Sequence, residues 1–595
     1  MSGGGAENGA GRRPLAGGSG RVAQDEGGSQ EREGRAIADR EPTRGPADGS
    51  MKDAFDGAGL SAEGPGFSPV DRARLRPANG EDINPGHTVG RGPGGSTDDH
   101  GDNSSAEIVP SADASTARTD ALSDAPTPAP SAAYPDATVA PTSRLPPKPA
   151  AAEGRGSVLG YARRFRRDLL SALPARLYRA WMADFRSPLI RSVVCNDPAL
   201  VRLVLAERPG DFPKSDRLRE GLAPLLGQSV FVTNGALWER QRRIIDPAFE
   251  GGRLRETFPA ILAASLAALQ RIAARACTGE IDIEPETSHA AADVIFRTLF
   301  SLPIEHRTAS EVFAAFRAHQ DAQPIVNLAA LVPLPAWLPR WHGRRTRRTA
   351  RRIRGLIEDM VADRAIAIAE GRAPDDLATK IMITPDPQTG QRFSPAEMVD
   401  QVAIFFLAGH ETSASALAWA LWLLADNPDW QARVAAEARA VLPDDAPDFG
   451  AVARLKTARA VFREAMRLYP PVPMMVRETI RTEHFRDRDL PRGTQVVISP
   501  WHLHRHERLW DDPDGFDPGR WDTESGRTSA RAAYIPFSAG QRVCPGAGFA
   551  MIEGPLLLAL ICRDLVLAPG AEPPVPVARL TVRGKDGIRL RLSRR

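Results

Sequence analysis

The residues with the clearest chemical potential surround one cysteine near the C-terminal end. In the stretch PFSAGQRVCPGAGFA, residues 536–550, Cys544 stands among glycines, with Arg542 two residues before it and Pro545 directly after it. Glycines allow tight turns and close approach of the backbone to a flat ligand. A helical pattern begins after Pro545, and a helix N-terminus lowers the pKa of a nearby thiol. The loop is therefore suited to present a thiolate.

Two readings of this cysteine are open from the residues alone. A single thiolate cannot complete a tetrahedral zinc site, but it can be the axial ligand of a haem iron. Phe537 could then shield the sulfur from water. The alternative is a structural cysteine in a glycine-rich turn. The four cysteines of the chain form no disulfide framework and fit a reducing compartment.

A second group, LAGHETSAS at residues 407–415, interrupts a long apolar segment. Gly409 and Thr412 weaken a helix interior, and Glu411 is costly to bury. A local rule broken inside a helix indicates a functional site. The alternative for Glu411 is a side chain turned toward solvent. His410 is interpreted as a bystander.

Two further pairs have helical spacing. Glu464 and Arg467 in EAMR share one helix face, as do Trp238 and Arg242 in WERQR. Each pair alone is a weak signal, since surface ion pairs show the same spacing.

A competing constellation is WHLHRHERLW, residues 501–510. If this segment were a strand, His502, His504 and His506 would share one face and could bind a metal ion. The alternative is structural packing around His504, Arg505 and Trp510.

Together these motifs resemble the cytochrome P-450 family, and the soluble, bacterial-type members in particular. Phe537, Gly540, Arg542, Cys544 and Gly546 reproduce the pattern F-x-x-G-x-R-x-C-x-G of its haem-ligand loop. The resemblance extends over about residues 158–595, with the motifs in the family's order. It implies a haem b cofactor whose iron takes an axial thiolate from Cys544.

The resemblance also implies roles for the other residues. Glu411 and Thr412 are the expected catalytic residues, which relay protons to oxygen. Glu464, Arg467 and Arg520 are expected to form a buried ion cluster that holds the loop carrying Cys544. The implied cofactor-binding residues, several of them facing the haem propionates, are Trp238, Arg242, Arg477, Phe537, Arg542, Cys544 and Gly546.

The implied function is a haem-thiolate monooxygenase that inserts one oxygen atom from O2 into a lipophilic small molecule. Electrons are expected from a separate ferredoxin- or flavodoxin-type donor, docking on basic residues such as Arg240 and Arg243. Two alternatives remain open: an enzyme that uses or rearranges peroxides, and a haem-thiolate sensor that binds a gas.

The elements that must position these residues are mostly helices. Helical patterns cover residues 344–370 and 398–428, whereas strand-like pieces are few: SPLIRSVVC, TQVVIS and the tail LTVRGKDGIRLRLS. We therefore expect a mainly α fold with minor β sheet, the cytochrome P-450 fold. Residues 161–185 predict a first helix, packed on the core or lying on a membrane surface.

Composition divides the chain of 595 residues in two. Residues 1–150 are rich in Gly, Pro and Ala and poor in aromatics, which predicts a disordered leader. Residues 151–595 form the predicted haem domain. The net charge of +3 gives no indication of nucleic-acid binding. Without a signal peptide or a run of about 18 apolar residues, we expect a soluble cytoplasmic protein with no transmembrane anchor.

Overall fold

The computed structural model describes residues 145–151, 168–187, 190–322, 343–578 and 580–595. The predicted leader, residues 1–150, lies outside the described residues except for its last six. That short piece contacts the helical domain: the Tyr469 hydroxyl donates to the Pro147 carbonyl at 2.8 Å, and Lys148 Nζ lies 2.5 Å from the Asp514 carboxylate. Pro146 is buried as well.

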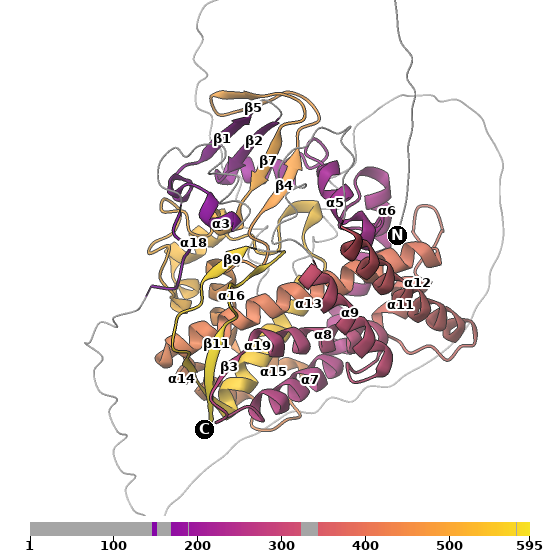
Figure 1. The fold of residues 1–595 in the computed structure, drawn as a ribbon, viewed down its shortest axis with the longest axis vertical. Coiled ribbons are helices and arrows are strands. Elements are labelled where there is room, and N and C mark those ends of the chain that lie inside the picture. Colours follow the sequence, from indigo (N-terminus) through magenta and orange to yellow (C-terminus); the bar gives the residue numbers. More distant parts are fainter. Residues whose placement is uncertain (1–144, 152–167, 188–189, 323–342, 579) are drawn as a thin grey trace, which may run out of the picture. The chain divides into compact units, whose positions relative to one another are not determined.

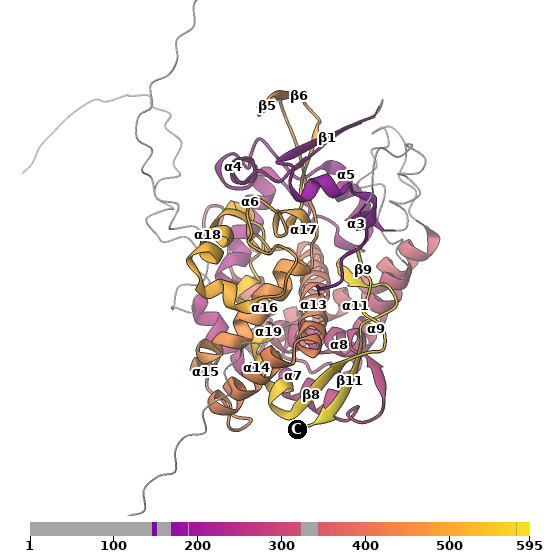
Figure 2. The same cartoon turned by 90° about the vertical axis from the view of Figure 1, so that its left-hand side faces the viewer.

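The long helix α13, Pro395–Asp426, runs through the middle of the described structure (Figure 1; Figure 2). Ser394 and Glu397 form a capping box at its start, and Pro395 takes the first helical position, where its missing N–H costs nothing. Most of its second half is buried, as its apolar sequence predicts. Against it pack α8 (Glu284–Phe300), α11 (Arg344–Ala369), α16 (Lys456–Leu468) and α19 (Ala547–Asp564).

Shorter helices and single turns surround these long helices. The other α-helices are α3 (Leu169–Ala172), α4 (Pro198–Arg202), α5 (Asp216–Leu226), α6 (Gly235–Ile245), α7 (Gly251–Ala273), α9 (Arg307–Ala322), α12 (Leu377–Ile383), α14 (Pro428–Val441), α15 (Phe449–Arg454), α17 (Pro500–Leu503) and α18 (Glu524–Ala533). The 3-10 turns are η3 (Ala175–Tyr178), η5 (Asp246–Phe249), η6 (Pro518–Asp522) and η7 (Gly540–Arg542), and η4 (Leu203–Glu207) is a π-helical turn.

Sheets are small. The largest has the order β1 (Met182–Ser187), β2 (Ile190–Cys195), β7 (Gln495–Ile498) and β4 (Met475–Glu478). Within it only β2 and β7 run parallel, with Ser192 opposite Gln495. A second sheet has the order β3 (Glu280–Asp282), β11 (Arg589–Arg594) and β8 (Leu565–Pro569). Two hairpins pair β5 (Glu483–Phe485) with β6 (Arg488–Leu490) and β9 (Pro576–Ala578) with β10 (Val582–Gly584).

The mainly α fold with minor sheet is confirmed, and the strand-like pieces of the sequence correspond to β2, β7, β10 and β11. The predicted first helix over residues 161–185 is wrong in its described part. After the short helix α3 the chain reaches Pro174, which cannot continue a helix without losing a hydrogen bond. From Met182 it forms β1, because the register with β2 pairs it along its full length.

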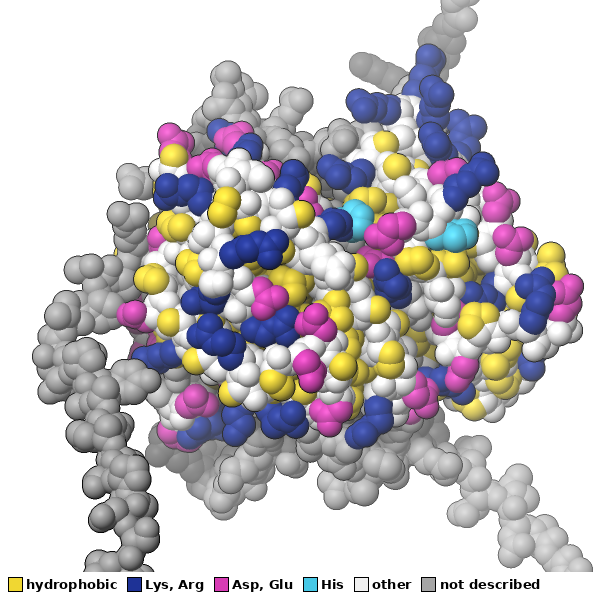
Figure 3. Space-filling model, turned by 90° about the horizontal axis from the view of Figure 1, so that it is seen from below, with side chains coloured by type: hydrophobic (Ala, Val, Ile, Leu, Met, Phe, Trp, Pro, Cys, Tyr) yellow, Lys and Arg dark blue, Asp and Glu magenta, His cyan; other side chains and the backbone are white. Residues whose placement is uncertain are grey.

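The surface carries both charge signs. On the face seen from below, acidic and basic side chains alternate over most of the area, and basic ones gather at one corner (Figure 3). Among the described helices, none has the length and apolar character needed to cross a membrane.

Candidate active site

The cysteine loop is shaped by its backbone. Gly540 has φ +67°, and a Cβ there would lie 2.2 Å from the Leu205 carbonyl oxygen, so no other residue fits without a shift. The Cys544 N–H donates to the Phe537 carbonyl at 2.9 Å and closes the loop. Helix α19 then begins at Ala547. The motif glycine at 540 is thus required by a close backbone approach.

The Cys544 side chain is accessible to solvent, although the surrounding protein partly desolvates its thiol. Burial raises the pKa of this thiol, whereas the N–H groups of Gly546 and Ala547 and the charge of Arg242 lower it. The expected lowering by the helix N-terminus is therefore present but is outweighed by desolvation. A metal cation bound at the sulfur would reverse this balance, because a coordinating thiol is deprotonated.

Four cations gather on the α6 side of this loop: Lys214, Arg242, Arg477 and Arg542. Arg242 donates to the Val543 carbonyl at 2.8 Å, directly before the cysteine. The Arg542 guanidinium lies 4.3 Å from the ring centroid of Trp238. Asn234 links two of the four, because its amide oxygen accepts from the Lys214 backbone N–H at 3.0 Å and from Arg542 at 3.1 Å.

The four neighbouring positive charges favour the binding of an anion. Burial and the neighbouring guanidiniums lower the pKa of Lys214 well below its usual value, and they lower the pKa values of Arg477 and Arg542 to about 10. The buried Nε atoms of Arg477 and Arg542 have no hydrogen-bond partner in the described structure. Among the described residues, Arg242 is the one member of the four that forms an ion pair, with Asp246 at 2.7 Å. Two carboxylates on a flat ligand would satisfy this set, so the residues fit a haem with its propionates.

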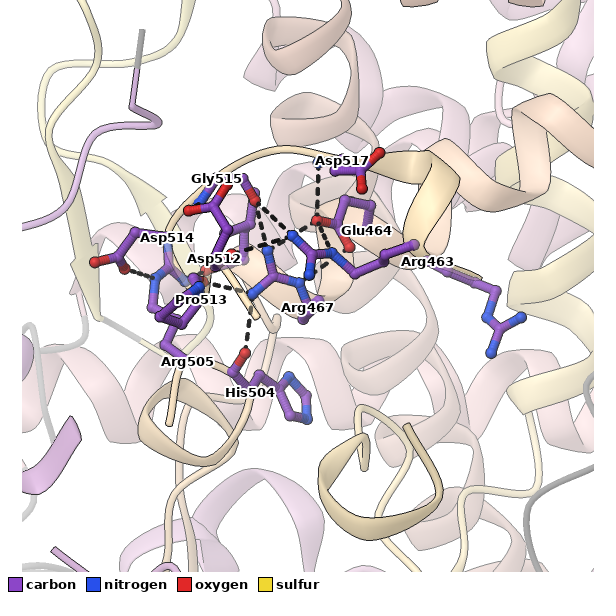
Figure 4. A network of polar contacts seen from close by, with 12 residues as sticks. Arg463, Glu464, Arg467, His504, Arg505, Asp512, Pro513, Asp514, Gly515 and Asp517 are labelled. Atoms are coloured by element: carbon purple, nitrogen blue, oxygen red, sulfur yellow. Dashed lines mark hydrogen bonds and ion pairs between the residues drawn. The ribbon is translucent and has the colours of Figure 1, made fainter. Parts of the chain in front are cut away.

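The predicted ion cluster forms, and its side chains are almost fully buried (Figure 4). Glu464 accepts from Arg467 at 2.8 and 3.0 Å and from Arg520 at 3.0 Å. A buried charge persists only when it is paired in this way.

The contacts of the cluster lead to a different segment than predicted. Arg467 donates to the carbonyls of His504 (3.0 Å), Pro513 (2.6 Å) and Gly515 (2.7 Å) (Figure 4). His504 in turn accepts from the Ile535 N–H at 2.9 Å, two residues before Phe537. Through these contacts the cluster fixes residues 504–515, and it reaches the cysteine loop only indirectly.

On α13, a Cβ at position 409 would lie 2.3 Å from Ile295 Cδ1, so any residue other than glycine would displace the Ile295 side chain. The hydroxyl of the half-buried Thr412 donates to the Ala408 carbonyl at 2.6 Å. Glu411 is only 3% exposed, so the alternative of an acid turned toward solvent is wrong. Arg583 Nη2 donates to both Glu411 oxygens, at 2.6 and 2.7 Å. Each member of the predicted acid–alcohol pair is thus bonded to another group.

The histidines lie apart. His410 is buried, contacts the Ser288 hydroxyl at 2.6 Å, and has its pKa lowered by burial to about 4. His502 is in helix α17 and His504 follows it, so the strand that a shared histidine face requires is absent at this place. His506 stacks on Trp181 at 4.6 Å. The described residues contain no group of three or more His, Cys, Asp or Glu side chains suited to a metal ion.

The expected docking arginines are engaged inside the fold. Arg240 contacts Glu397 at 2.6 Å, and Arg243 contacts the fully buried Asp386 at 2.6 Å. Two residues that the sequence reasoning missed are Lys214 and Arg583. Neither stands in a pattern: each is a single basic residue whose importance depends on segments far away in the chain.

Comparisons with known proteins agree with this geometry. A family model described as "Cytochrome P450" matches residues 178–588. "Cyclooctatin synthase" of Streptomyces melanosporofaciens is 33% identical over 62% of this chain and 80% of its own length. "Cyclooctat-9-en-7-ol 5-monooxygenase" of the same organism is 32% identical over 73% and 93%. Human "Cytochrome P450 4F2" is 27% identical over 70% and 83%.

A solved structure, the heme domain of cytochrome P450DA, superposes with a TM-score of 0.63 at 25% identity, over 76% of this chain and 98% of that chain. Because plant and human proteins are among the relatives as well as bacterial ones, the bacterial type stays a prediction.

Proposed function

The chain belongs to the cytochrome P450 family, whose members bind haem b through a cysteine thiolate and act as monooxygenases; on this basis we propose that Cys544 ligates the haem iron and that Glu411 and Thr412 deliver protons for oxygen insertion. Haem held by a thiolate supplies the reductive activation of O2. The protein supplies orientation, proton delivery and exclusion of water.

The observation that carries this proposal is the pairing of one thiol with one group of cations. Arg242 belongs to both, since it donates to the Val543 carbonyl and its charge lowers the pKa of Cys544. A flat ligand with a metal at its centre and carboxylates at one edge matches that combination. Trp238, Phe537 and Gly546 complete the proposed contacts with it.

For proton delivery, the Thr412 hydroxyl must turn away from the Ala408 carbonyl, which is its partner in the structure. Such a bond from a hydroxyl to the carbonyl four residues earlier is a local side-chain bond outside the helical ladder, so the hydroxyl can leave it without breaking the helix. The Glu411 side chain then takes up a proton from solvent and passes it to the hydroxyl.

We further propose a lipophilic substrate and a separate electron donor of the ferredoxin or flavodoxin type. The substrate proposal is supported by the apolar sequence of residues 321–339, which lies mostly outside the described residues, and by Met474 and Met475, whose flexible side chains suit an adaptable pocket. One relative is named for action on cyclooctat-9-en-7-ol. Because Arg240 and Arg243 are held in ion pairs, the donor would have to dock on other residues.

The haem domain is proposed to comprise residues 151–595, preceded by a leader. The contacts of Pro147 and Lys148 with Tyr469 and Asp514 support an earlier boundary, before Pro146. A chain shortened to begin at Leu145 should therefore melt at a higher temperature than one that begins at Ala151.

The test of the proposed function is Thr412→Ala. This variant should bind haem, carbon monoxide and substrate normally, but return most reducing equivalents as hydrogen peroxide. Losing an orienting hydroxyl should cost roughly 2–4 kcal/mol of transition-state stabilisation, about one to three decades in coupled rate.

The measurement is product and peroxide formed per reducing equivalent, for wild type and variant, with one reductase and one substrate. An unchanged ratio would contradict the proton-delivery role. It would also bring back the two alternatives, a peroxide-rearranging enzyme and a gas-binding sensor.

A further inference from the structure

The carboxylate of Glu411 lies where three separate elements meet. Arg583 of strand β10 donates to both of its oxygens, at 2.6 and 2.7 Å. The Thr581 hydroxyl, next to the same strand, donates to Oε2 at 3.2 Å. Gln320, near the end of α9, donates to Oε1. The acid is thus held by partners between 91 and 172 residues away in the sequence.

The rest of α13 holds strand β10 in register with this acid. Glu411, Ser415 and Trp419 are spaced by four residues, so they lie on one face of the helix. The Ser415 hydroxyl donates to the Val582 carbonyl at 2.6 Å, and the Trp419 indole N–H donates to the same oxygen at 3.0 Å. Successive turns of one helix therefore bind the consecutive residues 581–583, which fixes where Arg583 can reach.

The two charges differ in their access to water. The Glu411 side chain is 3% exposed, whereas the Arg583 side chain is 24% exposed. A buried carboxylate is destabilised strongly when its partner is removed. The guanidinium meets that need, and its exposed part can bind solvent water beside the acid.

We propose that Arg583 is a positioning residue for the reaction: it holds Glu411 in the orientation from which the acid serves Thr412, and it connects that acid with solvent. This inference rests on the proposed function, because it assigns Arg583 an effect only through Glu411. Without Arg583 the carboxylate loses its orientation, protons arrive late, and reduced oxygen leaves as peroxide. The C-terminal hairpin β9–β10 thereby becomes part of the catalytic apparatus.

The experiment is a double-mutant cycle in the haem-loaded enzyme with Glu411→Gln, Arg583→Gln and the combination of both. Arg583→Gln should lower product per reducing equivalent about three- to tenfold, since misorientation of a reacting group costs rate steeply. It should leave the carbon monoxide spectrum and the spectral affinity for substrate unchanged. Arg583→Lys, which keeps the charge, should recover most of the yield.

Arg594→Gln, which removes an exposed arginine of the neighbouring strand β11, is the matched control and should behave as wild type. A second readout is the melting temperature of the four proteins. Because Glu411 and Arg583 are in direct contact, their effects on stability should not be additive.

The double variant decides the outcome. If Arg583 acts through Glu411, adding Arg583→Gln to Glu411→Gln should lower the product yield no further. A further fall, or a wild-type yield in Arg583→Gln, would overturn this inference. If Arg583→Gln does not fold, the double variant, in which both charges are removed, can still be compared with Glu411→Gln alone. If Glu411→Gln itself keeps the wild-type yield, the proton-delivery proposal fails instead.

Discussion

The two sides of the candidate site are held in different ways. On the thiolate side, the Cys544 loop is closed by its own backbone within eight residues, and its glycine is dictated by a neighbouring carbonyl. On the α13 side, Glu411 is held by side chains from α9 and β10 that lie far away in the sequence. The first arrangement can be read from a short motif. The second becomes visible only in the folded chain.

The largest effect is expected from the ion cluster that supports the thiolate side. Arg467 is fully buried and donates to Glu464 and to three backbone carbonyls. Arg467→Ala removes all of these bonds and leaves the buried Glu464 with Arg520 as its one remaining ion partner among the described residues, so it should cost about 3–5 kcal/mol of stability. Denaturant unfolding of the haem-loaded protein measures it.

The matched control is Arg527→Ala, which removes a pair with Glu524 on the surface of α18. That pair should contribute less than about 1 kcal/mol. Equal effects of the two variants would show that the cluster has no special structural role.

A second prediction tests whether the four cations near the Cys544 loop bind the haem propionates or only stabilise the fold. Lys214→Met removes one of four neighbouring cations, so it should stabilise the haem-free chain slightly while weakening haem binding. The loss of one charge-assisted hydrogen bond to a propionate should cost about 1.5–3 kcal/mol. Haem transfer to apo-myoglobin compares the two affinities. Lys456→Met, at the exposed start of α16, is the control.

If haem affinity in Lys214→Met were unchanged, the cation group would not face the propionates. If the haem-free variant were instead less stable than wild type, the hydrogen bond that Lys214 Nζ donates to the Val230 carbonyl at 2.9 Å would outweigh the repulsion from the neighbouring guanidiniums.

These differences also decide what the sequence could predict. Cys544, the Glu464–Arg467–Arg520 cluster and the long helix α13 were all expected, because local spacing and backbone shape determine them. The prediction of a first helix was wrong at Pro174, which ends helical structure, and at β1, where pairing with β2 overrides helical spacing. Lys214 and Arg583 could not be found, since each acts through partners in distant segments.

The direction of the pKa shift of the Cys544 thiol could not be predicted from the sequence either. Its helix N-terminus was predicted correctly, but the burial that outweighs it depends on the packing of the whole site. The same holds for Glu411, whose orientation inward required the position of Arg583. Motifs identify which residues matter, whereas tertiary contacts decide how each side chain is held.

The smallest effect concerns pH and compares one histidine from each side. Burial lowers the pKa of His410 on α13 to about 4 and that of His504 beside the ion cluster to about 3. In an unfolded chain the pKa of each histidine is about 6.5. The folded protein therefore has its full stability above that pH, and it loses stability as the pH falls from 6.5 toward 4, because the unfolded chain binds a proton that the buried histidine does not. At pH 6 each should cost about 0.8 kcal/mol of stability.

Urea unfolding at pH 7.5 and pH 6 measures this difference. His410→Asn and His504→Asn should each reduce the loss between the two pH values by a similar amount. A variant that keeps the full wild-type loss would show that its histidine is charged in the folded protein.

The most direct test of the account is the spectrum of the reduced, carbon monoxide-bound protein after Cys544→Ser. Because Cys544 is proposed as the thiolate ligand, this variant should lose the red-shifted carbon monoxide band. Cys195→Ser, Cys277→Ser and Cys562→Ser should all keep it, since two of these thiols are buried elsewhere and the third lies on the surface. An intact band in Cys544→Ser would contradict the central claim.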